Sequence, residues 1–212
     1  MFALTIWSIC IIQIRMSSII HHMGHSREDK ARSHQRIVDI AARRFRESGL
    51  DGPGVAELMQ AAGLTHGGFY KHFGSRDDLV AEAVQRALTE REAEVAELLG
   101  DAADPLIAFV DWYASSEHRD SPGAGCGVVA LGADAARADP RVRAAYTAQV
   151  QRYLDRLESL LGDRQRAAAA LGTLVGSVLV ARALGPGPLS EEILRAARTA
   201  VTASRTASGV DA

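Results

Sequence analysis

Hydrophobic residues recur at helical spacing through most of the chain, and glycine and proline mark the ends of the periodic segments. In the clearest case, apolar side chains fall on one helix face for two turns from Val55 before Gly63 interrupts the pattern. Phe69 and Phe73 follow four residues apart, so both can face inward from a second short helix. Helix, glycine-containing turn and helix together predict a helix-turn-helix, whose second helix enters the DNA major groove in DNA-binding examples. Helical proteins also use this shape for packing alone.

The outward positions of the predicted second helix carry small or hydrogen-bonding side chains, which can approach a phosphate or a base edge closely. Thr65 is placed to cap the helix. We expect Tyr70 and Lys71 to contact phosphates, and Thr65 and His66 to fix the helix end or touch base edges. The full set expected to face DNA here is Thr65, His66, Gly67, Gly68, Tyr70, Lys71 and His72.

The segment from Ser26 to Ser48 predicts a helix with an apolar stripe and a basic opposite side. Arg27, Lys30 and Arg32 lie at its start, where we expect them to reach phosphates. An N-terminal arm that enters the minor groove would fit the same arrangement. The alternative is an ordinary solvated face, because basic residues are common on exposed helices.

Beyond Phe73 the apolar spacing predicts helices to the end of the chain. Ser75 is placed to cap one long helix with Asp77 and Asp78 in its first turn, and the spacing continues to Gly100. The stretch 120–125, which contains proline and glycine, predicts a flexible loop. The other predicted helices span 105–113, 127–137, 140–161, 164–184 and 190–204.

Composition agrees with an all-helical protein. The chain has 212 residues, enough for one or two domains, and aromatic residues make up 5% of it. Its formal charge of −2 means that a nucleic-acid surface must come from local clustering of basic residues. Its two cysteines, Cys10 and Cys126, do not suggest a disulfide framework, so a reducing cytoplasm fits.

The first 22 residues do not fit this picture. Their apolar run is too short to span a bilayer and lacks the basic start and cleavage site of a signal peptide. We expect translation to begin at Met23, with a membrane-anchoring tail as the alternative interpretation of 1–22. His21, His22 and His25 could ligate a metal, but a disordered polar tail is the expected account. We predict no metal and no cofactor.

The sequence GLTHGGFYKHFGSRDDLV, together with the preceding helix at 37–48, resembles the DNA-binding domain of the TetR/AcrR family of bacterial repressors. The resemblance covers about a quarter of the chain and is specific, because spacing and residue type agree at many positions. One departure is Gly54, where many members carry a threonine cap; glycine is a weaker but acceptable N-cap. The matching positions are Ile37, Ala41, Phe45, Gly49, Val55, Leu58, Ala62, Gly63, Phe69, Tyr70, His72, Phe73 and Leu79.

This resemblance implies an all-α protein with a three-helix helix-turn-helix domain at 26–75 and a helical ligand-binding and dimerisation domain at 76–205. Residues 1–25 and 206–212 are expected to be a disordered or misassigned extension and a disordered tail. The implied protein is not an enzyme. It is a cytoplasmic regulator, expected to be a repressor that a small-molecule inducer or a thiol modification releases from a palindromic DNA operator. The long helix after Ser75 would connect the ligand and DNA domains.

In the family, the last two long helices form a four-helix bundle across a two-fold axis, which implies a homodimer here. Gly172 and Gly176 lie four residues apart, and such small residues let helices approach closely. Packing within one subunit would demand the same residues. The expected interface centres on Gly172, Gly176, Ala181, Ile193 and Ala197.

Cys126 is the second residue of a GC-x-x-x-x-LG segment that is similar to one in a TetR subgroup with some regulators that respond to electrophiles or oxidants. A thiolate near a helix N-terminus has a lowered pKa, and His118 or Arg119 could assist its reaction. The alternative is a small buried hydrophobic residue, the commoner fate of a single cysteine. A thiol enzyme using Cys126 as nucleophile and His118 as base is a further alternative, as is an interaction protein that does not bind DNA.

Aromatic side chains in the C-terminal half could line a pocket for an organic inducer. Most of the same side chains would also make an ordinary core. The candidate ligand-binding or sensing residues are Phe109, Trp112, Tyr113, Cys126, Tyr146 and Tyr153.

Overall fold

The computed structural model describes residues 27–206, and this range consists of helices and their connections without a strand. The predicted all-α fold is confirmed. After an N-terminal helix at 27–48, the elements are α2 (Val55–Ala61), the 3₁₀ helix η1 (His66–Lys71), α3 (Arg76–Thr89), α4 (Glu92–Gly100), α5 (Pro105–Tyr113), α6 (Ser116–Asp120), the 3₁₀ helix η2 (Pro122–Ala124), α7 (Gly127–Ala135), α8 (Pro140–Leu161), α9 (Arg164–Leu184) and α10 (Pro188–Thr206). The expected extension at 1–25 and the tail beyond Thr206 lie outside the described residues.

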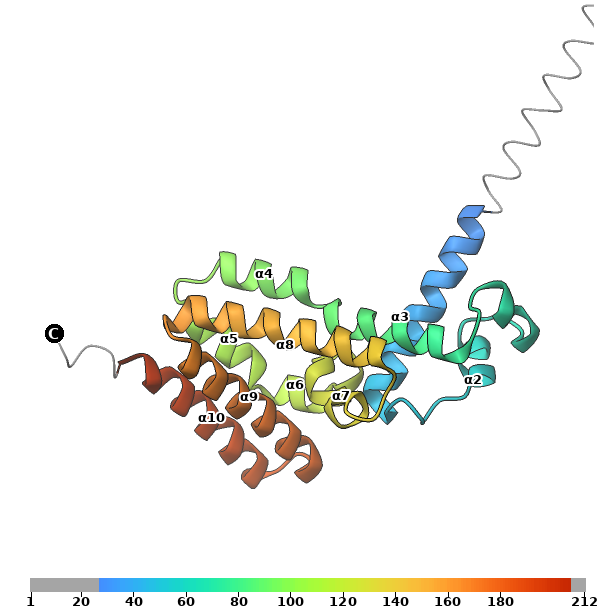
Figure 1. The fold of residues 1–212 in the computed structure, drawn as a ribbon. Coiled ribbons are helices and arrows are strands. Elements are labelled where there is room, and N and C mark those ends of the chain that lie inside the picture. Colours follow the sequence, from blue (N-terminus) through green and yellow to red (C-terminus); the bar gives the residue numbers. More distant parts are fainter. Residues whose placement is uncertain (1–26, 207–212) are drawn as a thin grey trace, which may run out of the picture.

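The helices form a head and a body that share a continuous core (Figure 1). The head consists of the N-terminal helix, α2 and η1, and α3 leads from it into the body. In the body, α9 packs between α8 and α10, and α3 packs against α8. Buried side chains run without interruption from Ile37 in the head to Val201 in α10, so the orientation of the head is set by packing as well as by chain connectivity.

Local capping explains why the long body helices begin and end where the sequence predicts. The side chain of Asp139 accepts a hydrogen bond from the Arg141 amide, and Pro140 occupies the first turn of α8. Gly162 ends that helix in the left-handed conformation, with φ of 72°. Ser75 likewise accepts from the Asp78 amide at the start of α3, as predicted.

The prediction of one unbroken helix from Ser75 to Gly100 is wrong. The helix stops at Thr89 and restarts at Glu92, and Figure 1 shows α4 displaced from the line of α3. Arg91 leaves the helical conformation, with φ of −97° and ψ of 6°. Helix propensity does not explain this break, because Glu90, Arg91 and Glu92 are all good helix formers. Instead, the Glu90 and Arg91 side chains are drawn to partners in distant segments, described below.

The stretch 120–125 is ordered by contacts, contrary to the prediction of a flexible loop. It contains the end of α6 and all of η2, and Gly123 is buried against Glu47 of the N-terminal helix. The short helix α6 was not predicted. The last helix starts two residues earlier than predicted, at Pro188, and continues to Thr206.

Candidate nucleic-acid interface

The 3₁₀ helix η1 presents an exposed polar surface on the head. Thr65, His66, Gly67 and Lys71 are exposed, and Gly68 is half-buried. Tyr70 is 76% exposed, and its ring rests edge-on against Phe69 with 5.3 Å between centroids. An aromatic residue this exposed, beside a lysine and two glycines, is suited to contact with an extended partner.

Buried aromatic rings hold this surface in place. Phe69 and Phe73 stack with 5.5 Å between centroids, and both are buried, which confirms the predicted inward face. The Arg36 guanidinium donates to the Ala62 carbonyl at 3.3 Å and so ties the end of α2 to the N-terminal helix. The inner side of η1 is therefore packed against the head, while its outer face is exposed.

Two expectations for η1 are corrected. Thr65 is the N-cap residue, but its side chain makes no capping hydrogen bond. His72 does not face outward: it is half-buried, and its Nδ1 is buried without a hydrogen-bond partner among the described residues. A 3₁₀ helix has three residues per turn, so His72 follows Phe69 onto the inner face. Burial lowers the pKa of His72, and the nearby His34, Lys30 and Lys71 lower it further.

The basic residues at the start of the N-terminal helix differ in how free their charges are. Arg27, Lys30 and Arg32 are all exposed, as expected. Arg32, however, pairs with Asp29 and lies 3.8 Å from Glu28 on its own helix. Its charge is therefore partly compensated, and Lys30 is the better placed cation because it lies close enough to η1 to act on His72.

A buried arginine, which the sequence reasoning missed, joins the head to the body. The Arg46 side chain is 3% exposed; its Nε donates to the Gly123 carbonyl at 2.8 Å and its Nη1 to the Ala87 carbonyl at 3.3 Å. Its Nη2 pairs with Glu90 at 2.6 Å. Arg46 follows Ala42 by four residues and so lies on the buried face of its helix. This position in the apolar pattern is the sequence signal that could have predicted the burial of Arg46.

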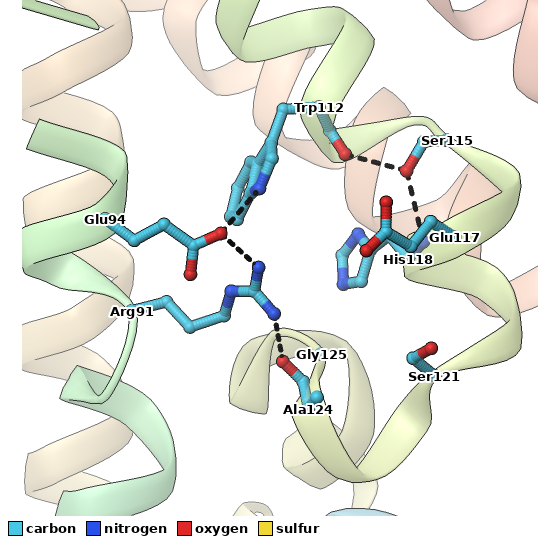
Figure 2. Close-up of a pocket in the computed structure, with 9 residues that line it drawn as sticks. All are labelled: Arg91, Glu94, Trp112, Ser115, Glu117, His118, Ser121, Ala124 and Gly125. Carbon is cyan, nitrogen blue, oxygen red and sulfur yellow. Dashed lines mark hydrogen bonds and ion pairs between the residues drawn. The ribbon is translucent and has the colours of Figure 1, made fainter. Parts of the chain in front are cut away.

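The body contains a cavity of about 140 Å³ between α4, α5, α6 and η2 (Figure 2). Trp112 forms one wall, and the Arg91 guanidinium carbon lies 5.3 Å from its ring centroid. Arg91 also pairs with Glu94 and donates to the Ala124 carbonyl. Arg91 therefore fills part of the cavity, which lies next to the break between α3 and α4.

Trp112 is the one predicted aromatic residue that lines this cavity. Phe109, Tyr113 and Tyr153 are buried against one another, with ring centroids 5.7–6.2 Å apart. Tyr146 donates its hydroxyl to the Val128 carbonyl at 3.0 Å. These side chains form a packed core, which was the alternative interpretation.

Cys126 lies within this core, 4% exposed, with its Sγ 3.4 Å from the hydroxyls of both Tyr113 and Tyr153. His118 does not bond the thiol: its Nε2 accepts from the Cys126 amide at 2.9 Å. Its Nδ1 lies 2.6 Å from the Tyr113 carbonyl and so carries the proton. Arg119 pairs instead with Asp120 and Glu191. This arrangement does not provide the thiol–base pair that the enzyme alternative needs.

Comparison with known proteins decides the family. The family model for bacterial regulatory proteins of the tetR family matches residues 37–83. The segment at 37–83 is therefore a DNA-binding domain of the TetR family.

Two curated relatives and one solved structure show how far the similarity extends. The HTH-type transcriptional repressor Rv1474c of Mycobacterium tuberculosis is 38% identical over 95 residues, 42% of this chain and 50% of that protein. The HTH-type transcriptional regulator AcrR of Shigella flexneri is 33% identical over 57 residues, 27% of this chain and 26% of that protein. The matched segments thus span about a quarter to a half of these relatives. A TetR regulator from Chloroflexus aurantiacus superposes with a TM-score of 0.74 at 24% identity, covering 84% of this chain and 96% of that one, so its likeness shows the fold.

The chain leaves one apolar face of α9 uncovered. The residues of this face are not all those expected for the dimer interface. Ala181 and Ala197 are buried within the subunit and cannot meet a second copy, while Ile193 is half-buried. Gly172 and Gly176 face open space. The large exposed apolar side chains nearby are Leu179, Val180, Leu184 and Leu189. By length and composition α9 could also cross a membrane; in the structure it packs between α8 and α10.

Among the described residues, no group of three His, Cys, Asp or Glu side chains is arranged to hold a metal ion. The candidate ligands His21, His22 and His25 lie outside this range.

Replacing Arg46 should destabilise the fold strongly. In Arg46→Ala, the Gly123 carbonyl loses its donor and Glu90 loses its partner, so we expect a loss of roughly 2–4 kcal/mol in the free energy of unfolding. Arg43→Ala is the matched control, because Arg43 is exposed on the same helix and pairs with Glu47; its cost should stay below about 1 kcal/mol. Urea unfolding measures both. Equal effects would contradict the role assigned to Arg46.

His118 should make stability depend on pH in the mildly acidic range. Burial lowers its pKa to about 4. The unfolded chain, with a histidine pKa near 6.5, then binds the proton more readily, so stability is present above pH 6.5 and falls as pH decreases toward 4. The difference between these two pKa values contributes about 3 kcal/mol to the free energy of unfolding above pH 6.5. We expect His118→Gln, which does not titrate, to show a shallower loss between pH 6.5 and 4 than the wild type; parallel curves would refute the assignment.

Proposed function

We propose that the chain is a homodimeric transcriptional repressor that binds a palindromic operator through η1 and releases it when an effector binds the body. The observation that carries this proposal is the exposed face of η1, seated on buried Phe69 and Phe73 inside the segment that matches the tetR family. Both curated relatives compared above are named as transcriptional regulators, and one as a repressor. A regulator of this kind acts on DNA, so its place is the cytoplasm.

In the proposed complex, η1 lies in the major groove. Tyr70 and Lys71 contact phosphates, because they are the exposed hydroxyl and ammonium groups at its C-terminal end. Thr65 and His66 lie at the other end, where the Thr65 hydroxyl is not used for capping and can reach a base edge. Gly67 and Gly68 let the backbone approach closely. From the N-terminal helix, Arg27 and Lys30 reach flanking phosphates, and Arg32 contributes less because of its own ion pairs.

We assign dimerisation to the uncovered face of α9. Its exposed Leu179, Val180 and Leu184 form an apolar surface, and Gly172 and Gly176 leave space for a partner helix to approach. Leu189 and Ile193 extend this surface onto α10. A two-fold axis through such a face places two heads on the same side of the molecule, which a palindromic site requires.

Release of DNA requires a ligand with different affinities for the bound and free conformations. The cavity beside Arg91 is the proposed effector site, because it adjoins both the α3–α4 break and η2, which contacts the head. A non-covalent effector suits the structure better than thiol modification. The Cys126 sulfur is buried between two tyrosine hydroxyls, so a reagent would have to open the core to reach it.

Lys71→Ala should weaken DNA binding in a salt-dependent way. Losing one phosphate contact should lower affinity nearly equally for all sequences and reduce the slope of log K against log salt by about 1. Fluorescence anisotropy at several salt concentrations measures this slope. Arg137→Ala is the control, because Arg137 is an exposed cation beyond the end of α7, and its slope should match the wild type. An unchanged slope for Lys71→Ala would remove Lys71 from the interface.

Leu179→Asp should dissociate the dimer. The substitution places a charge in the apolar face of α9, and burial of an unpaired carboxylate is costly. Sedimentation equilibrium should show a monomer at concentrations where the wild type is a dimer. Ile107→Asp is the control, because Ile107 is an exposed apolar residue on α5, away from this face, and it should leave the dimer intact. A dimeric Leu179→Asp protein would place the interface elsewhere.

A further inference from the structure

Arg91 occupies the body cavity as a ligand would. Its guanidinium lies over the Trp112 ring, pairs with Glu94 and donates to the Ala124 carbonyl at 2.5 Å (Figure 2). Its Nε is buried without a hydrogen-bond partner among the described residues. Aromatic face, carboxylate and carbonyl are the three kinds of group that recognise a planar cation. The site is therefore suited to a cation, while Arg91 leaves one of its own donors unpaired there.

The groups around the cavity are mainly acceptors. Glu94 and Glu117 contribute carboxylates, and Trp112 contributes its ring face. Two of the donors along its wall are already engaged: Trp112 Nε1 bonds Glu94, and the Ser115 hydroxyl bonds the Trp112 carbonyl. The Ser121 hydroxyl, which is neutral, also lines the cavity. His118 stays neutral near pH 7, since burial lowers its pKa to about 4, and both of its ring nitrogens face protein partners. Without Arg91 the residues that line the cavity would carry two carboxylates and no cation, which favours a cationic ligand. Arg182 lies behind Gly125 and His118, where its guanidinium donates to the His118 and Arg119 carbonyls.

We propose that this cavity binds a ligand with a planar cationic head group, a guanidinium or an amidinium, which displaces Arg91 from Trp112 and Glu94. The charge of the site is unchanged by this exchange, because one cation leaves as another enters. Arg91 lies near the surface, so its released side chain can be solvated. The cavity of about 140 Å³ is of the size that accepts a benzene-sized group, so a single ring attached to the cation fits.

Displacement of Arg91 reaches the DNA-binding head through η2. Arg91 holds the carbonyl of Ala124, and Arg46 of the head holds the carbonyl of the preceding residue, Gly123. The residue before Arg91 is Glu90, which pairs with Arg46. A ligand that displaces Arg91 therefore removes one of the two arginines that bond this turn. It also weakens the contacts of Arg46 with the Gly123 carbonyl and with Glu90. This consequence, lower affinity for DNA, rests on the proposed function, whereas the ligand site itself does not.

The site is tested by calorimetry on the full chain with phenylguanidinium, using phenylurea as the neutral ligand of the same shape. We expect phenylguanidinium to bind at least ten-fold more tightly than phenylurea. Glu94→Gln, which alters a half-exposed carboxylate without touching the core, should weaken phenylguanidinium at least ten-fold. Equal binding of the two ligands, or tighter binding of benzoate, would overturn the cationic assignment.

A second variant separates displacement from simple addition. Arg91→Ala removes the internal cation, so phenylguanidinium should bind several-fold more tightly to it than to the wild type, while Arg137→Ala should bind as the wild type does. A structural role for Arg91 alone predicts equal or weaker binding, and that result would overturn the displacement. Thermal melts establish whether each variant is folded. If Arg91→Ala is unfolded, Glu94→Gln still tests the site.

The link to DNA is read separately by anisotropy. Phenylguanidinium should lower the affinity of the wild type for its operator, and Arg91→Ala should show lowered affinity without ligand. Ligand binding that leaves DNA affinity unchanged would overturn the coupling through η2. Failure of the wild type to bind any DNA would instead refute the proposed function, because calorimetry reports on the cavity independently.

Discussion

One buried guanidinium fixes the polar junction between the DNA-binding head and the body, beside the apolar core that the two share. Arg46 lies at the meeting point of the N-terminal helix, the end of α3 and η2, where it bonds the Gly123 and Ala87 carbonyls and pairs with Glu90. A buried charge is tolerated when its hydrogen bonds and its counter-charge are supplied together, and removing either partner is then costly. The junction therefore has one well-defined geometry. A change at η2 that breaks these bonds would let the head take up another position.

The same junction explains why the cavity lies where it does. The interruption of the helix between Thr89 and Glu92 places two consecutive side chains in opposite roles: Glu90 binds the head, while Arg91 reaches into the body. Arg46, the partner of Glu90, donates to the Gly123 carbonyl, and Arg91 donates to the neighbouring Ala124 carbonyl. In the proposed mechanism these direct contacts couple occupancy of the cavity to the orientation of the head.

Features governed by local physics could be predicted from the sequence. The bounds of α8 follow from the Asp139 cap, Pro140 and Gly162, and the inward face of η1 follows from the spacing of Phe69 and Phe73. Features governed by distant partners could not. The break at Arg91 depends on Trp112 and Ala124, and the burial of Arg46 depends on η2, which was expected to be a flexible loop. His72 was misplaced because η1 is a 3₁₀ helix, and Ala181 was misplaced because periodicity does not tell which of two apolar faces the subunit covers.

The measurement that tests the central claim most directly is hydroxyl-radical footprinting of the full chain on duplexes selected from a random-sequence DNA pool. A dimer that places two η1 helices in successive major grooves should protect two symmetric half-sites on one face of the duplex, with centres about 10 base pairs, or a multiple of that, apart. Protection of a single unpaired site, or recovery of no preferred sequence at any salt concentration, would contradict the account of this chain as a dimeric, operator-binding regulator.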